Sequence, residues 1–394
     1  MSEKIPKGWK RVTLKDAILV NPSETLYKKS IAKKVPMEAL QPFAKRIRIF
    51  LLEKYKGGAK FRNGDTLVAR ITPSLENGKT AYVDFLEDDE IGFGSTEFIV
   101  LREIKGITDK QFIYYFAISN DFREIAIKSM TGSSGRQRVQ TEVVKKIEFY
   151  LPPLPEQIAI ASVLSSLDDK IDLLHRQNQT LEKMAETLFR QWFIEEVDEG
   201  WEEKPLGEYF ELLGGFAFKS KEYSDFGKYK IITIKCVQDG YLNTSSAPTI
   251  KILTKKIKPY QILNVGDILI SLTGNVGRVC LVDEDNCLLN QRVAKIVPKN
   301  HKWKPFAYFY FRRPEMIEML TNLSKGSAQL NLSPVETLKQ IDSFPIDNKI
   351  HRFNKIVQPF FEKIINNKIQ IHTLEKLRDT LLPKLMNGEV RVKL

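Results

Sequence analysis

Residues 151–193 read LPPLPEQIAIASVLSSLDDKIDLLHRQNQTLEKMAETLFRQWF, and this stretch decides how the rest of the chain is organised. Its three prolines predict a stiff, extended lead into a helix. Apolar residues then recur at seven-residue spacing over four heptads, which is typical of a coiled-coil helix with a partner. A helix over residues 156–193 would be about 57 Å long, so we expect a spacer. The two sets of seam positions are Leu164, Ile171, Asn178, Ala185 and Trp192, and Ile160, Leu167, Leu174, Leu181 and Leu188.

The second half of the chain repeats the plan of the first half. Gly8-Trp9 is matched by Gly200-Trp201, and Leu181-Glu-Lys recurs at Leu374-Glu-Lys, 193 residues further along. Internal repeats decide an architecture, so this offset predicts a second helix with its own seam. Because proline starts, kinks or ends a helix, residues 359–382, between Pro359 and Pro383, are the part of that helix predicted without interruption. The second seam comprises Val357, Ile364, Ile371, Arg378 and Leu385, with Phe360, Asn367, Leu374 and Leu381.

The predicted fold class is mixed α/β (α+β) with a pseudo-two-fold internal repeat. Two similar globular domains are separated by two long antiparallel coiled-coil helices. In the first globule we expect strands at Thr66–Ile71, Lys79–Phe85 and Phe98–Leu101, and helical spacing over Asp109–Lys128. The expected segments are a first globule at 1–152, a central spacer helix at 153–196, a second globule at 197–345 and a C-terminal spacer helix at 346–394.

The two helices are expected to pair with each other. Residues 153–196 hold four basic and eight acidic side chains, whereas residues 346–394 hold ten basic and five acidic ones. Opposite net charges attract, and an antiparallel register with Asn178 opposite Asn367 surrounds these two residues with apolar layers, Leu174 facing Ile371. Buried Asn at such a position commonly fixes register. In the alternative, both helices pack onto another subunit.

Composition favours a cytoplasmic binding protein. Lys and Arg number 61 against 49 Asp and Glu, which points to a polyanionic partner such as nucleic acid, although a merely basic surface is an alternative. Three cysteines cannot form a disulfide framework, and no signal peptide or membrane-spanning run is recognisable. We therefore expect a reduced, cytoplasmic location without a membrane partner.

No catalytic constellation is recognisable in the sequence. A Walker A loop and an HExxH motif are missing, the four histidines are scattered, and Gly92-Phe-Gly94 lacks the third glycine of a dinucleotide loop. Asp168, Asp169 and Asp172 are interpreted as a solvated or partner-facing acidic stripe. The chain is therefore predicted to bind no metal or cofactor. Two alternatives are a self-contained nuclease or methyltransferase with a cryptic site, and a scaffold that binds only proteins.

Three kinds of feature are candidates for DNA contact: basic clusters that neutralise phosphates, the turn after each Gly-Asp strand, and a pair of equivalent polar loops suited to reading base edges. The basic clusters are Lys28, Lys29, Lys33, Lys34, Lys45, Arg46 and Arg48, then Lys219, Lys221, Lys255, Lys256 and Lys258. The turns hold Arg70, Ser74 and Asn77, then Asn275 and Arg278. The loops hold Ser133, Ser134, Arg136, Gln137 and Arg138, then Ser327, Gln329 and Asn331.

Several motifs, in this order and duplicated, give the chain a resemblance to a known family over nearly its whole length. They are Pro6-Lys-Gly-Trp9, Leu151-Pro-Pro-Leu-Pro-Glu-Gln157, Leu188-Phe-Arg-Gln-Trp-Phe193, Gly200-Trp201 with Leu206-Gly207-Glu208, and Leu381-Leu-Pro-Lys-Leu-Met-Asn-Gly-Glu-Val390. The chain resembles the specificity subunit of type I restriction–modification systems.

The resemblance implies a non-catalytic subunit whose two globules are target-recognition domains, each reading one half of a bipartite, asymmetric site in double-stranded DNA. The paired helices would set the half-site spacing and dock two modification (methyltransferase) subunits, and the assembly would recruit ATP-dependent restriction subunits. AdoMet, ATP and Mg²⁺ would belong to those partners. The second helix begins with Phe344-Pro-Ile-Asp347 instead of the triple proline, which leaves open whether both methyltransferases dock with identical contacts.

Overall fold

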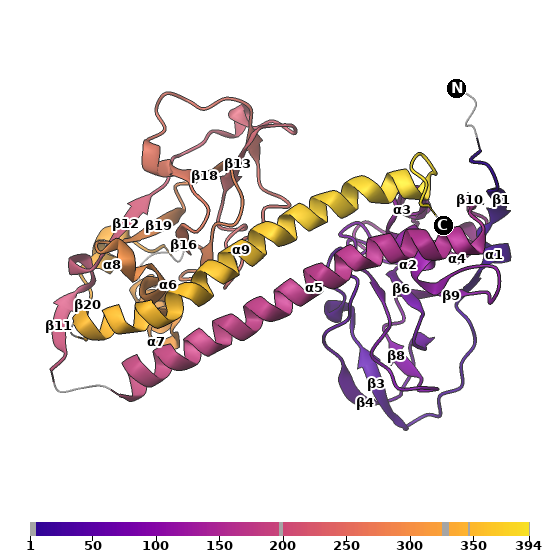
Figure 1. The fold of residues 1–394 in the computed structure, drawn as a ribbon, viewed down its shortest axis with the longest axis horizontal. Coiled ribbons are helices and arrows are strands. Elements are labelled where there is room, and N and C mark those ends of the chain that lie inside the picture. The colour runs from indigo at the N-terminus through magenta and orange to yellow at the C-terminus, as the bar shows by residue number, and fades with distance from the viewer. Residues whose placement is uncertain (1–4, 197–199, 325–330, 346, 394) are drawn as a thin grey trace. The chain divides into compact units, whose positions relative to one another are not determined.

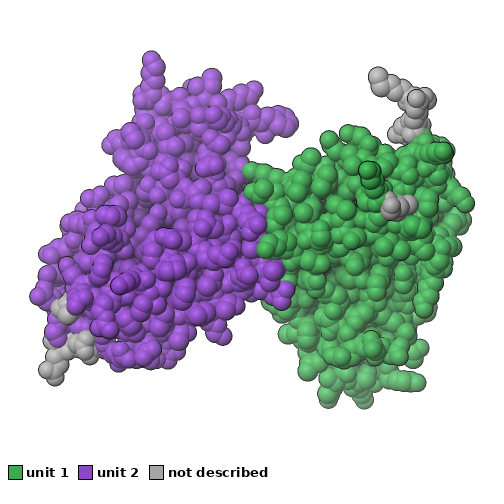
Figure 2. Space-filling view, viewed as in Figure 1, with its two compact units in different colours: residues 1–172, 373–394 green, residues 173–372 purple. Residues whose placement is uncertain are grey.

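The computed structural model describes residues 5–196, 200–324, 331–345 and 347–393. The chain divides into two compact units, unit 1 with residues 1–172 and 373–394, and unit 2 with residues 173–372 (Figure 2). Each unit combines one globule with part of each of two long helices, because each globule packs its core onto both helices. The compact units thus cut across the four segments expected from the sequence.

Unit 1 contains two four-stranded sheets and a two-stranded ribbon (Figure 1). The strand orders are β2-β9-β6-β7 and β4-β3-β8-β5, and β1 pairs with β10. The strands are β1 Lys10–Thr13, β2 Ile18–Val20, β3 Ile31–Val35, β4 Leu51–Lys54, β5 Lys60–Phe61, β6 Thr66–Ala69, β7 Thr80–Tyr82, β8 Gly92–Gly94, β9 Phe98–Glu103 and β10 Glu148–Leu151. The short helices are α1 Leu14–Ala17, η1 Met37–Ala39, α2 Lys110–Ile118, α3 Asn120–Lys128 and α4 Thr141–Lys145.

Unit 2 repeats this topology. Its sheets have the orders β12-β19-β16-β17 and β14-β13-β18-β15, and β11 pairs with β20. The strands are β11 Glu202–Pro205, β12 Phe210–Gly214, β13 Tyr229–Ile232, β14 Thr249–Ile250, β15 Ile262–Leu263, β16 Ile268–Ser271, β17 Val279–Leu281, β18 Cys287–Leu289, β19 Val293–Pro298 and β20 Ile341–Phe344. The short helices are η3 Leu206–Glu208, η4 Ser220–Glu222, η5 Pro259–Gln261, η6 His301–Trp303, α6 Lys304–Arg312, α7 Pro314–Ser324 and α8 Pro334–Leu338.

The repeated Gly-Asp pairs make the same turn before a fully buried strand in both units. Gly64 and Gly266 have φ of +91° and +84°, a conformation that glycine adopts without steric cost. The aspartate that follows closes the turn, since Asp65 accepts the amide of Arg62 at 2.7 Å and Asp267 accepts that of Asn264 at 2.9 Å. The turn of unit 1 explains why β6 begins at Thr66, as the sequence predicts, and the equivalent turn precedes β16 in unit 2.

The helical spacing over Asp109–Lys128 corresponds to two helices rather than one. Ser119 has an extended backbone, ends α2, and accepts the amide of Phe122 at the start of α3. A serine side chain at such a position satisfies an amide that has no partner within the helix. Unit 2 has the same break, where Pro314 begins α7 directly after α6.

The long helices are α5, Leu154–Arg190, which continues into a π-helical turn (η2, Gln191–Glu195), and α9, Asp347–Met386. Within each unit their segments run antiparallel, as expected. Helix α9 lies within the predicted spacer segment 346–394 and passes through both Pro359 and Pro383, so it extends beyond residues 359–382, the part that the sequence predicts without interruption. Both prolines are exposed, so water can satisfy the two carbonyl groups that lose an amide partner. Burial of flanking residues such as Val357 and Leu385 outweighs the missing hydrogen bonds.

Candidate nucleic-acid interface and helix pair

In unit 2, a pair of buried asparagines fixes the register of the two helices. Asn367 Nδ2 donates to Asn178 Oδ1 at 2.8 Å, and Asn178 Nδ2 donates to the carbonyl of Ile364 at 3.4 Å. Leu174 and Ile371, predicted to form the adjacent layer, are both buried. The predicted pairing of Asn178 with Asn367 is confirmed.

Outside the asparagine pair, the buried face of the helices is wider than the seam of a two-stranded coiled coil. One set of seven-spaced positions is buried throughout in α9, but in the other set Leu167, Leu181, Leu188, Phe360, Leu374 and Leu381 are only partly buried. Neighbouring residues such as Phe189 and Leu382 are buried instead, within the globule cores. A helix that contacts both a partner helix and a globule needs this broader apolar face.

In unit 1, a buried ion pair takes the place of an apolar layer. Arg378 Nη1 lies 2.9 Å from Asp168 Oδ1, and the two residues are 7 % and 6 % exposed. Tyr115 donates its hydroxyl to the other Asp168 oxygen at 2.6 Å. Of the two interpretations of the acidic stripe, Asp168 therefore fits the partner-facing one, because it faces Arg378 of α9 and is buried. Desolvation by burial lowers the pKa of Arg378, but the negative charges of Asp168 and Asp379 outweigh this effect, so that the pKa is raised.

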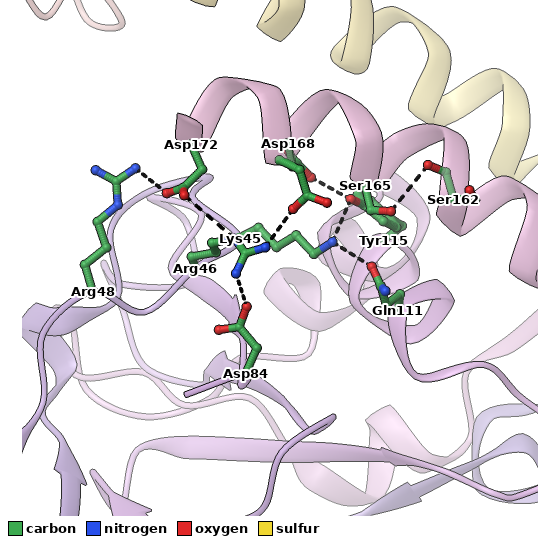
Figure 3. A network of polar contacts seen from close by, with 11 residues as sticks. Lys45, Arg46, Arg48, Asp84, Gln111, Tyr115, Ser162, Ser165, Asp168 and Asp172 are labelled. Carbon is green, nitrogen blue, oxygen red and sulfur yellow. Dashed lines mark hydrogen bonds and ion pairs between the residues drawn. The ribbon is translucent and has the colours of Figure 1, made fainter. Parts of the chain in front are cut away.

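Three predicted DNA contacts face helix α5 instead of forming a free basic cluster. Lys45 is buried and donates to Gln111 at 2.8 Å, and burial lowers its pKa. Arg46 pairs with Asp84 and, at 2.8 Å, with Asp169. Arg48 pairs with Asp172 at 2.8 Å. The acidic residues of α5 thus hold this segment of the first globule, and Lys45 in particular cannot reach a phosphate (Figure 3).

The polar loop of unit 1 lies against the turn that follows β6, so two predicted groups come together. Ile71 bridges to Arg138 through the backbone, and the amide of Thr72 donates to the carbonyl of Gln137 at 3.0 Å. Arg70 and Arg138 both pair with Glu97, at 3.3 and 2.8 Å.

The tip of the same loop is open. Hydrogen bonds from Arg138 hold the pKa of Glu97 below its usual value, so a charged carboxylate anchors the base of the loop. The other predicted loop residues Ser133, Ser134 and Arg136 are exposed, as is Asn77 in the turn, while Ser74 is half-buried.

Unit 2 shows the same pairing of turn and loop where it is described. Thr273 bridges to Asn331, and the amide of Leu332 donates to the carbonyl of Leu272 at 2.7 Å. Ser327 and Gln329 lie outside the described residues. In the turn, Asn275 is exposed and Arg278 donates to Gln238.

The predicted lysines differ in how free they are. In unit 1, Lys33 pairs with Glu90 at 2.8 Å and Lys34 with Glu53 at 2.7 Å, so their charges are partly neutralised within the fold. The remaining predicted lysines are exposed on the surface of their own unit: Lys28 and Lys29 in unit 1, and Lys219, Lys221, Lys255, Lys256 and Lys258 in unit 2.

A buried carboxylate at the start of α5 was not singled out from the sequence. Glu156 accepts from the indole of Trp9 at 3.1 Å and from Arg391 at 2.7 Å. At the offset of 193 residues its counterpart is Lys349, whose ammonium group lies 5.7 Å from the ring centre of Trp201. The repeated pairs Gly8-Trp9 and Gly200-Trp201 are the feature of the sequence that could have pointed to this contact. The two helix starts therefore place opposite charges against equivalent tryptophans, Glu156 against Trp9 and Lys349 against Trp201.

Within the described residues, no group of three or more His, Cys, Asp or Glu side chains is arranged to hold a metal ion. The three cysteines are buried, and desolvation raises the pKa of Cys280 and of Cys287. No helix in the described part of the chain is both long and apolar enough to span a membrane.

The fold and these surfaces define a duplicated binding protein, with two equivalent globules carried on antiparallel helices. A family model described as the type I restriction modification DNA specificity domain matches residues 6–183 and again residues 198–376. The chain belongs to this family and contains two copies of its domain.

Individual relatives are similar to the chain over most of its length. The MjaIX specificity subunit of Methanocaldococcus jannaschii is 29 % identical over 306 residues, covering 72 % of this chain and 69 % of the relative. The HindI specificity subunit of Haemophilus influenzae is 24 % identical and covers 84 % and 87 %. The crystal structure of a type I S subunit from M. genitalium has the same fold, with a TM-score of 0.59, 19 % identity and coverage of 98 % and 97 %.

Proposed function

We propose that this chain is the non-catalytic DNA-recognition subunit of a type I restriction–modification complex. Each globule reads one half of a bipartite, asymmetric site in double-stranded DNA, and the paired helices carry the two readers. The observation that supports this most is the repeat itself, since two globules of identical sheet topology are each joined to both helices. A single-site enzyme has no need for two such equivalent units.

We assign base reading to the polar loop of each unit together with the turn that it contacts. The exposed lysines are assigned to the DNA phosphates. In unit 1 these are Arg136 with its neighbouring serines, next to the arginines that Glu97 holds in place. Arginine and small polar side chains read base edges in the major groove, whereas lysines on phosphates position the protein without reading sequence.

The partners follow from the family. Two methyltransferase subunits dock on the helices, and restriction subunits join the assembly. AdoMet, ATP and Mg²⁺ are bound by those partners. The unlike helix starts, with Glu156 in one copy and Lys349 in the other, imply that the two methyltransferases do not make identical contacts.

The test is methylome sequencing of a host that expresses this chain with its partner subunits. We expect a bipartite methylated motif, and exchange of residues 1–150 for those of another specificity subunit should change only one half-site. Insertion of one heptad between Gln177 and Gln179 should change the spacer and leave the half-site letters unchanged. Cleavage or methyl transfer by the purified chain alone, with metal and AdoMet, would instead favour a self-contained enzyme.

A further inference from the structure

In each globule, the second four-stranded sheet ends in a pair of antiparallel strands at the same edge. These pairs are distinct from the separate β1–β10 and β11–β20 pairs. In unit 1 this is β3 paired with the edge strand β4, and in unit 2 it is β13 paired with the edge strand β14. In both units the inner strand also pairs in parallel with the next strand of the sheet. In Figure 1 both sheets lie away from the long helices of their own unit. We call residues 28–56 ribbon 1 and residues 219–258 ribbon 2.

Both ribbons expose large apolar side chains, although their sequences differ. In ribbon 1, Leu51 and Leu52 on the edge strand are 47 % and 71 % exposed. In ribbon 2, Phe226 is 91 % exposed and Ile252, two residues after the edge strand, is 81 % exposed. An uncovered edge strand with apolar side chains favours aggregation, and natural proteins usually cover or charge it. In unit 2 the edge strand β14 itself carries the buried Ile250 and is bridged by Ser224, so Phe226 and Ile252 flank the edge there. Exposed apolar side chains on or beside the equivalent edge of both globules indicate that they meet a partner.

The ribbons also hold the basic surplus of the chain. Ribbon 1 contains nine basic and two acidic residues, of which Lys33, Lys34, Lys45, Arg46 and Arg48 are buried or paired within unit 1 and Lys28, Lys29, Lys54 and Lys56 are exposed. Ribbon 2 contains nine basic and three acidic residues. The surplus of the entire chain is 12, so the rest of the sequence is close to neutral. A surface that mixes lysines with exposed apolar side chains fits DNA better than protein, because the cores of protein interfaces are depleted in lysine.

We propose that ribbons 1 and 2 also enter a groove of the DNA, one in each half-site, in addition to the turn and loop of each unit that read base edges. The major groove admits a two-stranded β-ribbon, and apolar side chains there contact the methyl group of thymine. Exposed lysines on the same ribbons, such as Lys54 and Lys255, neutralise the flanking phosphates. This inference rests on the proposed function and extends it by naming apolar base-contacting residues that charge and motif searches pass over.

The apolar contacts are tested in the complex of the full chain with its methyltransferase subunits. The variant Leu51→Ser/Leu52→Ser should bind the cognate site about tenfold more weakly, the loss typical of one mismatched base pair, with non-specific binding unchanged. Its methylation motif should relax in one half-site only. Phe226→Ser/Ile252→Ser should relax the other half-site. The matched control is Ile107→Ser, which alters a 42 % exposed apolar residue of unit 1 outside the ribbon and should change neither affinity nor motif.

The phosphate contacts are tested by the salt dependence of DNA binding. Lys255→Ala/Lys256→Ala should lower the slope of log affinity against log salt by about 1.8 if each lysine meets one phosphate. The control Lys299→Ala/Lys302→Ala removes two exposed lysines of unit 2 outside the ribbon and should leave the slope unchanged.

Three results separate the possible failures. Ribbon variants that behave like their controls, with a wild-type complex that binds its site, would overturn the ribbon assignment alone. Loss of a co-purifying methyltransferase from Leu51→Ser/Leu52→Ser, with the motif intact, would also overturn it, because the patch would then contact protein. A wild-type complex without sequence-specific binding would refute the proposed function itself.

Discussion

Replacing Arg378 with methionine should destabilise unit 1 selectively. The substitution keeps much of the side-chain volume but leaves the buried Asp168 without its guanidinium partner at 2.9 Å. Breaking a buried ion pair by removing one partner typically costs about 3–5 kcal/mol. Lys45 also lies near Asp168 and compensates part of its charge, so we expect a loss near the lower end, about 3 kcal/mol.

Hydrogen–deuterium exchange measured by mass spectrometry separates the two units. A loss of about 3 kcal/mol corresponds to exchange more than a hundredfold faster in those peptides of residues 154–172 that exchange only when unit 1 opens. Peptides of the unit 2 core should change much less. The control Glu124→Gln breaks an exposed pair with Lys128, and such pairs contribute at most about 1 kcal/mol.

A triple variant completes the test. Lys45→Met, Asp168→Leu and Arg378→Met together remove the buried charges, and replacing a buried ionic cluster with apolar side chains is often neutral or stabilising. Most of the stability lost in Arg378→Met should therefore return. A change of less than fivefold in Arg378→Met, or a triple variant less stable than the single one, would show that burial of the pair does not control this layer.

Three further predictions follow from single contacts. Cysteines placed at Leu174 and Ile371 should form a disulfide on oxidation, because both side chains are buried in the layer next to the asparagine pair; an absence of the bridge contradicts the register. Pro359→Ala should raise the melting temperature, since alanine restores one helical hydrogen bond and proline costs up to about 3 kcal/mol in a helix interior; an unchanged or lower value indicates that proline is accommodated without cost. The pKa of Glu97, followed by carboxyl NMR, should rise in Arg138→Gln, because Arg138 holds it below its ordinary value. In the wild type, the attachment of the loop should be complete above the ordinary glutamate pKa and should be lost as the pH falls through the lowered one; a pKa unaffected by the substitution contradicts this account.

The repeat and the helix pairing were predictable from sequence because both depend on spacing. Seven-residue periodicity and the single asparagine in each seam are visible in the letters, and together they place Asn178 opposite Asn367. The sequence left open whether the helix is continuous through Pro359 and Pro383, because local propensity there is outweighed by burial of neighbouring residues, which only the folded structure shows.

The candidate interface was less predictable because charge alone does not reveal accessibility. Lys45, Arg46 and Arg48 form a basic cluster in the sequence, but the acidic residues of α5, more than a hundred positions away, pair with the two arginines. Conversely, Leu51 and Leu52 were not singled out from the sequence, and the edge position of β4 leaves them exposed. Long-range pairing decides both cases.

The two polar layers, Asp168 with Arg378 and Asn178 with Asn367, determine which halves of the chain can pair with each other. At the offset of 193 residues, Asp168 and Arg378 correspond to Phe361 and Ala185, and the asparagine pair corresponds to Leu174 and Ile371. Two copies of α5 paired in the same register would bring Asp168 against Ala185 and Asn178 against Leu174. Two copies of α9 would likewise bring Arg378 against Phe361.

Every polar side chain in these layers would then be buried opposite an apolar one, at a cost of about 1–3 kcal/mol or more for each. Each half of the chain therefore rejects a copy of itself and accepts the other half. A gene split between the halves should therefore yield heterodimers in preference to either homodimer. The sequences of the two helices, as well as those of the two globules, then favour an assembly with two unlike halves and thus an asymmetric site.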